Sequence, residues 1–251
     1  MIQGFDSDSP PDTAPARASV SPEPEPADRW WLIPALLLTG FGLLIWQVKT
    51  HGPVVTLDVH VRGRIQDWAR SPSMAWFFHL GRAMADLGDL SVALPVLLVV
   101  TALAIRATRS WRPALVTTAA SAALAAVIPL KVWISRPGPS GAPHGDASFG
   151  FFPSGHTADA VLCYGTSALL LCAFVIPDGP NARHLRQAAI TAACILVTAT
   201  IFGLLWSNFH WLSDTVGSLC WCGAALAVLL RVANLTGNAG AGTRPRGHAV
   251  N

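Results

Sequence analysis

Two histidines and an aspartate are the residues of this sequence best suited to chemistry. His210 and Asp214 are four positions apart, so on a helix they share a face and the carboxylate can hold one ring nitrogen. The other ring nitrogen then stays free to act as a nucleophile or a base. The simpler alternative is an interfacial histidine beside an acid that caps a helix, and spacing alone leaves both readings open.

The segment Pro153-Ser154-Gly155-His156 stands where a polar stretch enters an apolar run. A helix that begins there offers unpaired backbone amides and the positive end of its dipole, both of which favour an anion. Ser154 and Gly155 could then approach a phosphate, and His156 could donate a proton to a leaving oxygen. Without that context, Ser-Gly-His is only a turn and a helix cap.

Two basic residues precede this segment. Lys131 closes an apolar run, and Arg136 follows it in Ser135-Arg-Pro-Gly-Pro139, where proline stiffens the chain and could hold a cation toward an anion. Each of the two could instead be a basic side chain that extends to the membrane surface. Together with Ser154 and Gly155, they are the candidates for binding an anionic substrate.

The elements that must position these residues are membrane helices. Hydrophobic residues make up 52% of the 251 and charged residues 12%, against roughly 45–50% and 25% in soluble domains. The apolar residues form runs of about twenty, the length that crosses a bilayer. The net charge of +3 is small and its basic residues are scattered, so no nucleic-acid partner is expected. We predict an all-α, polytopic membrane protein.

Six transmembrane helices in a bundle are expected. Their spans are, in chain order, about 30–48, 90–107, 113–133, 157–176, 187–207 and 211–233. The stretch from Gly52 to Gly88 mixes charged and apolar residues and is too polar to span, so it should form short amphipathic surface helices. Residues 1–29 and 236–251 are expected to be disordered cytoplasmic tails on either side of a membrane domain at 30–235.

Arginines near the span ends predict the orientation. They follow the second span, the fourth span and the last span, and the positive-inside rule places all three regions in the cytoplasm. These residues are Arg106, Arg109, Arg112, Arg183, Arg186, Arg231, Arg244 and Arg246. Both termini are then cytoplasmic, and the candidate residues meet at the extracytoplasmic face of the cell membrane. The long first loop also holds arginines, but acidic residues accompany them.

The five cysteines all fall inside apolar runs, where a thiol behaves as a small hydrophobic residue. Cys220 and Cys222 have neither a second pair nor a neighbouring histidine at the spacing of a zinc site. No metal site is therefore predicted.

Taken in chain order, the segments with Lys131 and Arg136, with residues 153–156, and with His210 and Asp214 resemble the three signatures of the type 2 phosphatidic acid phosphatase superfamily. These signatures are Lys-x6-Arg-Pro, Pro-Ser-Gly-His and Ser-Arg-x5-His-x3-Asp. The second signature is complete at 153–156 and the third keeps its histidine and aspartate, over a resemblance that covers about residues 30–235. It implies a phosphohistidine formed on His210. It also implies that Asp214 orients this nucleophile, that His156 protonates the leaving group, and that no metal or cofactor takes part.

Two positions depart from the signatures. Gly138 stands where the first signature has arginine, and Gly203-Leu204 stands where the third has Ser-Arg. A charge-assisted hydrogen bond contributes roughly 1.5–3 kcal/mol, so two missing ones weaken transition-state binding by about 3–6 kcal/mol. That is on the order of a hundred- to ten-thousand-fold in rate. Arg136, two residues before the expected arginine, could offset part of this loss.

The resemblance implies hydrolysis of a phosphomonoester or diphosphate on a membrane lipid, with polyprenyl diphosphate, phosphatidic acid and phosphatidylglycerol phosphate as candidates. The missing arginines keep a second hypothesis open, a weakened member that binds or transports a lipid phosphate. A third is phosphoryl transfer to an acceptor other than water. The superfamily's vanadate-dependent haloperoxidases resemble soluble proteins, so that activity is not expected here. The expected partners are the lipid substrate and the bilayer, and no oligomeric state follows from the sequence.

Overall fold

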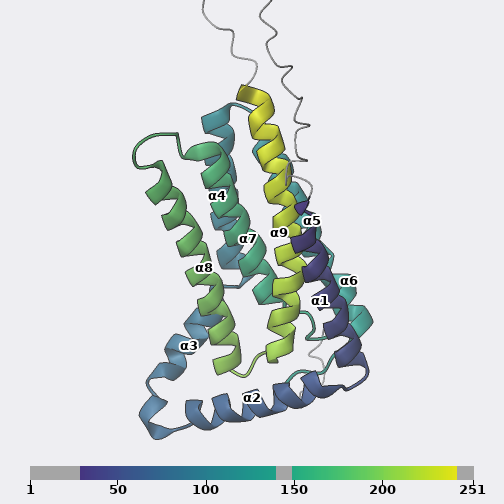
Figure 1. Cartoon of the computed structure of the whole chain (residues 1–251). Coiled ribbons are helices and arrows are strands. Elements are labelled where there is room, and N and C mark those ends of the chain that lie inside the picture. Colours follow the sequence, from purple (N-terminus) through teal and green to yellow (C-terminus); the bar gives the residue numbers. More distant parts are fainter. Residues whose placement is uncertain (1–28, 140–148, 242–251) are drawn as a thin grey trace, which may run out of the picture.

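The chain folds into a bundle of helices (Figure 1). The structure is a computed structural model that describes residues 29–139 and 149–241. Across these residues it contains helices and their connections and no strand, so the predicted all-α fold is confirmed. The helices are α1 (Leu32–Lys49), α2 (Pro53–Ala69), η2 (Pro72–Met74), α3 (Phe77–Asp86), α4 (Leu90–Thr108), α5 (Arg112–Ala125), α6 (Val127–Ile134), α7 (Gly155–Leu170), η3 (Leu171–Val175), α8 (Ala182–Trp206) and α9 (Leu212–Ala241).

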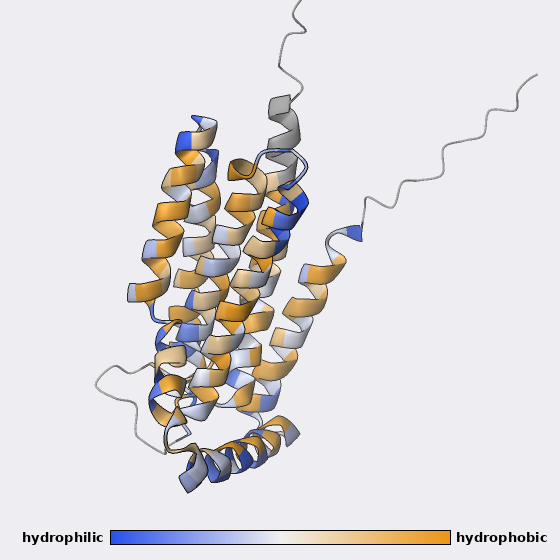
Figure 2. Cartoon of the chain, turned by 90° about the vertical axis from the view of Figure 1, so that its left-hand side faces the viewer, coloured by the Kyte–Doolittle hydropathy of each residue, from blue (hydrophilic) through white to orange (hydrophobic). Residues whose placement is uncertain are grey.

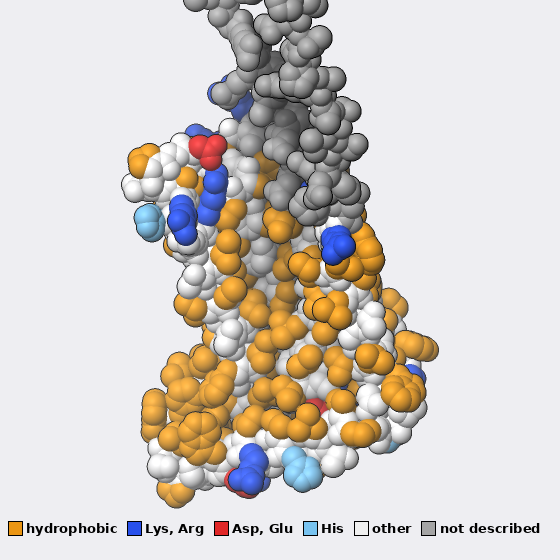
Figure 3. Space-filling model, viewed as in Figure 1, with side chains coloured by type: hydrophobic (Ala, Val, Ile, Leu, Met, Phe, Trp, Pro, Cys, Tyr) orange, Lys and Arg blue, Asp and Glu red, His pale blue; other side chains and the backbone are white. Residues whose placement is uncertain are grey.

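Six helical segments of the described chain are long and apolar enough to cross a membrane. They are Leu32–Lys49, Leu90–Thr108, Arg112–Ile134, Gly155–Val175, Ala182–Trp206 and Leu212–Ala233, and each overlaps one predicted span. Large apolar side chains such as Leu36, Val99 and Ile195 are exposed on their outer faces. Figure 2 shows that hydrophobic residues dominate the middle of the helices, and Figure 3 shows hydrophobic side chains on the surface there, with charged side chains toward the ends. A lipid environment accounts for such a surface, so the protein is a multi-pass membrane protein.

α7 lies at the centre of the bundle, in contact with α4, α5, α8 and α9 (Figure 1). Most of its residues are buried, and its apolar side chains share one core cluster with residues of α4, α5 and α9. Between α4 and α5, the hydroxyls of Thr101 and Thr117 are hydrogen bonded at 2.7 Å. The start of α7, which carries the Ser-Gly-His segment, is therefore held in the middle of the bundle.

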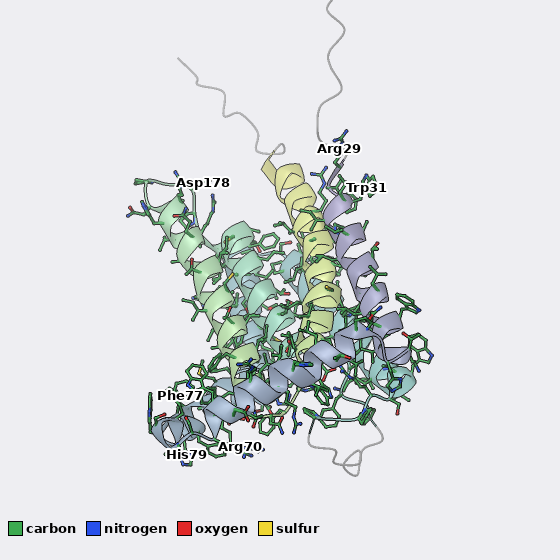
Figure 4. The ribbon with its side chains drawn as sticks, turned by 60° about the horizontal axis from the view of Figure 1, so that its bottom comes forward. Arg29, Trp31, Arg70, Phe77, His79 and Asp178 are labelled. Carbon is green, nitrogen blue, oxygen red and sulfur yellow. The ribbon has the colours of Figure 1, made fainter. Side chains whose placement is uncertain are left out.

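The polar stretch between the first two spans forms the amphipathic surface helices that were predicted. α2 starts at Pro53, a residue suited to the first helical turn, and lies across one end of the bundle (Figures 1 and 4). α3 packs closely against α8 because two glycines meet there. A Cβ at Gly203 would lie 2.6 Å from the Gly81 oxygen and would overlap the Ala85 nitrogen.

The last helix is longer than its membrane span, which ends at Ala233. α9 continues to Ala241, past residue 235 where the membrane domain was expected to end. No proline interrupts this stretch. Residues 1–28 and 242–251 lie outside the described residues, and the disordered tails expected there stay a prediction.

Candidate active site

His156 and His210 face each other at the end of the bundle that α2 crosses. Their ring centroids are 6.4 Å apart. Both line a cavity of about 410 Å³ whose other lining residues are Lys131, Phe149, Gly150, Phe151, Gly155 and Asp159. The cavity thus brings together candidates from α6, from the start of α7 and from the segment before α9.

Asp214 holds the ring of His210. The Nδ1 atom of His210 lies 3.2 Å from Asp214 Oδ2, and the Trp211 backbone amide donates to the same oxygen at 3.0 Å. Asp214 is fully buried and sits in the first turn of α9, where the helix dipole favours a carboxylate. With Nδ1 held by Asp214, the Nε2 atom of His210 is the ring nitrogen left for chemistry.

The start of α7 offers unpaired amides to the cavity. The Ser154 hydroxyl caps the helix by accepting from the Thr157 amide at 3.3 Å, and the Ser154 amide donates to the Asp214 carbonyl at 3.1 Å. Among the described residues, the amides of Gly155 and His156 donate no hydrogen bond. Two free N–H groups at a helix N-terminus are a favourable place for an anion.

Lys131 brings a positive charge to the same place. Its Nζ atom donates to the Pro153 carbonyl at 3.2 Å, and a Cβ built on Gly155 would lie 3.8 Å from it. Lys131 also lines the cavity. The structure therefore places the lysine ammonium beside the free amides of α7.

Arg136 lies elsewhere. Its buried guanidinium donates from NH1 to Asp214 Oδ1 at 2.6 Å and to Ser213 Oγ at 2.7 Å, and from NH2 to Asp58 Oδ2 at 2.6 Å. It lines a separate cavity of about 190 Å³ and is not among the residues that line the histidine cavity. The expected contact of Arg136 with a phosphate does not fit this geometry, because both terminal nitrogens already have partners.

Comparison of the sequence with models of protein families identifies the family of this chain. A profile described as PAP2 superfamily matches residues 110–237, which include all three signature segments. The chain belongs to the PAP2 superfamily. A crystal structure described as the first transmembrane PAP2 type phosphatidylglycerolphosphate phosphatase from Bacillus subtilis has the same fold, with a TM-score of 0.68 at 21% identity. The match covers 81% of this chain and 96% of that one. No curated protein matches the chain.

At the two positions where PAP2 signatures carry arginine, this chain packs tightly. A Cβ on Gly138 would lie 2.6 Å from the Phe151 ring, which in turn contacts His210 edge to face at a centroid distance of 5.6 Å. Leu204 is fully buried, and its neighbour Gly203 touches the α3 backbone. An arginine at either position would require this packing to change.

Two acidic residues near His156, Asp159 and Asp89, were not among the site residues predicted from the sequence. Asp159 lines the cavity one turn after His156, and this spacing of three was a signal available in the sequence. Asp89 caps α4, accepting from the Ser91 amide at 2.8 Å. Hydrogen bonds from the side chain and backbone of Ser91 lower the pKa of Asp89, and His156 adds a smaller electrostatic contribution. Asp89 is therefore an anion at neutral pH.

Two arginines of the surface helices reach the residues that flank His210. Arg62 donates to Asn208 Oδ1 at 2.7 Å, and the Arg82 guanidinium lies 5.4 Å from the centroid of the Phe209 ring. The sequence had shown them only as part of the charge of a long loop. In the folded chain their guanidinium groups contact the residues on either side of His210 in the sequence.

Proposed function

We propose that this protein is a membrane lipid-phosphate phosphatase that works through a phosphohistidine. The observation that carries the proposal is the arrangement of the two histidines. His210 is held at Nδ1 by Asp214 and stands opposite His156 across one cavity. A nucleophile, a group that orients it and a proton donor are the parts that two-step phosphoryl transfer requires.

The proposed reaction has two steps. In the first, the Nε2 lone pair of His210 attacks phosphorus, the bond from phosphorus to the leaving oxygen breaks, and His156 gives that oxygen a proton. In the second, a water loses a proton to His156 and attacks the phosphohistidine, which releases inorganic phosphate and frees His210. Each histidine returns to its starting state, so the cycle closes with one water consumed.

Phosphate binding in this proposal rests on charge and on backbone amides. Lys131 and the free amides of Gly155 and His156 would stabilise the equatorial oxygens, where charge develops during transfer. Ser154 serves this site by capping α7, and Arg136 serves it by contacting Asp214. The proposed chemistry requires no metal ion or other cofactor.

The proposed substrate is a lipid phosphate at the extracytoplasmic face. The site lies where the spans α7 and α9 begin, at the boundary between apolar and polar surface, which suits a lipid headgroup. The arginine pattern of the loops supports cytoplasmic termini and an outward site. Polyprenyl diphosphate, phosphatidic acid and phosphatidylglycerol phosphate are the candidates, and the name of the Bacillus subtilis protein supports including the last.

The crowded positions 138 and 204 favour a second candidate function, the binding or transport of a lipid phosphate without cleavage. Transfer to an acceptor other than water is a further variant. The experiment that separates these functions measures phosphate released from a panel of lipid phosphates by purified protein in detergent with EDTA.

We expect release by the wild-type protein, unchanged by EDTA, and none by His210→Ala. Release that requires an added alcohol would identify a transferase. Binding of the same lipids by folded protein, without release under any of these conditions, would instead establish the binding or transport function.

A further inference from the structure

Asp58 is an unusual residue on a surface helix. α2 lies across the end of the bundle, and Asp58 is its single buried residue, with 1% of its surface exposed. The other acid of this helix, Asp67, is exposed and has no hydrogen bond or ion pair among the described residues. Burial of a carboxylate is costly unless it is paired, so the partners of Asp58 explain its position.

Those partners are the residues next to the nucleophile. Asp58 Oδ2 accepts from Arg136 NH2 at 2.6 Å and from the Ser213 hydroxyl at 2.6 Å, and Oδ1 accepts from the Ser213 amide at 2.9 Å. Arg136 NH1 in turn donates to Asp214 Oδ1 at 2.6 Å. A continuous series of contacts therefore runs from α2 through Arg136 and Asp214 to His210.

The geometry at Arg136 shows what Asp58 does. A guanidinium prefers to grip one carboxylate with two parallel hydrogen bonds. Here the two terminal nitrogens of Arg136 bind different carboxylates, one Asp58 and the other Asp214. Asp214 Oδ2 is thereby left to His210 and to the Trp211 amide. Without Asp58, Arg136 could turn both nitrogens toward Asp214 and compete with His210 for that oxygen.

We propose that Asp58 is a positioning residue for the phosphatase reaction. By binding one terminal nitrogen of Arg136, it leaves only the other nitrogen to Asp214, so that one oxygen of Asp214 stays in contact with His210. This inference rests on the proposed function. Asp58 lies outside the residues that the PAP2 profile matches. Through this contact, one residue of the surface helix α2 supports the position of the nucleophile.

The test compares Asp58→Asn with Asp67→Asn, a matched change on the same helix. We expect kcat of Asp58→Asn to fall about 10- to 100-fold, while KM stays within about twofold because the cavity residues are untouched. Asp67→Asn should match the wild type. The melting temperature should fall in either case, because Asp58→Asn breaks a buried ion pair, but a change that merely loosened the fold would alter KM as well.

A second variant tests whether the binding of Arg136 to two different carboxylates is what matters. Lysine cannot bind a carboxylate with two parallel hydrogen bonds, so Asp58→Asn/Arg136→Lys should recover kcat by about fivefold or more over Asp58→Asn. If Asp58→Asn does not fold, the double variant alone decides, and we expect its kcat within about tenfold of the wild type. A folded Asp58→Asn with wild-type kcat, or a double variant without recovery, would overturn the inference. A wild-type protein that cleaves no lipid phosphate would instead overturn the proposed function, and the inference with it.

Discussion

At the scale of single residues, the role of His156 can be tested through the leaving group. A general acid matters most when the leaving oxygen is a poor leaving group, as in an alkyl lipid phosphate. His156→Ala should therefore lower kcat/KM for a lipid phosphate by about 10²- to 10⁴-fold. With p-nitrophenyl phosphate, whose leaving group needs little protonation, the loss in kcat/KM should stay below about tenfold, because kcat/KM reports formation of the phosphohistidine and not its slow hydrolysis. Steady-state kinetics on the two substrates provide the measurement.

His60→Ala, a change at an exposed histidine of α2, is the control and should leave both rates unchanged. Equal losses in kcat/KM on the two substrates in His156→Ala would mean that His156 only shapes the helix start. The acid role would then be wrong.

Residue spacing predicted part of this site. The interval of four between His210 and Asp214 and the Ser-Gly-His cap of α7 both come from local structure, which a sequence pattern displays. The contact of Asp58 with Arg136 joins residues 78 positions apart in the chain. Such a contact depends on how α2 lies across the bundle, so no local pattern could have predicted it.

At the scale of helices, the contact of α3 with α8 depends on a missing side chain. Gly203→Ala would force a methyl group against the α3 backbone at Gly81 and Ala85. Overpacking of this kind costs about 1–3 kcal/mol, so we expect a lower melting temperature in detergent. Gly42→Ala is the matched control in α1, since a Cβ there meets nothing within 4 Å. It should be neutral, or stabilising by up to about 1 kcal/mol. If Gly203→Ala melts with the wild type, the close crossing of the two helices is wrong.

Hydropathy predicted the spans well and their ends less well. α8 begins at Ala182, before the expected start at 187, because its first turns are polar and a hydropathy pattern does not count them. Arg183 and His184 belong to these turns. The close approach at Gly203 was also invisible, since a glycine in an apolar run does not reveal which helix it faces.

At the scale of the whole molecule, the orientation of the protein in the membrane is a prediction that labelling can test. Asp67 lies on α2 at the site end of the bundle, and Asp178 lies in the connection before α8 at the other end (Figure 4). In a variant without the native cysteines, Asp67→Cys should react with a membrane-impermeant maleimide in intact cells. Asp178→Cys should react only after lysis, because the positive-inside rule predicts that the arginine-rich connections are cytoplasmic. The reverse pattern would put the site inside the cell.

The most direct measurement of the central claim is a label trapped on His210. His156→Ala protein mixed with a ³²P-labelled aryl phosphate should form the phosphohistidine readily but hydrolyse it slowly, because the residue proposed to activate water is missing. We predict a base-stable, acid-labile label on the peptide that contains His210, and none in His156→Ala/His210→Ala. Turnover without any protein-bound label, or a label that persists in the double variant, would contradict the account.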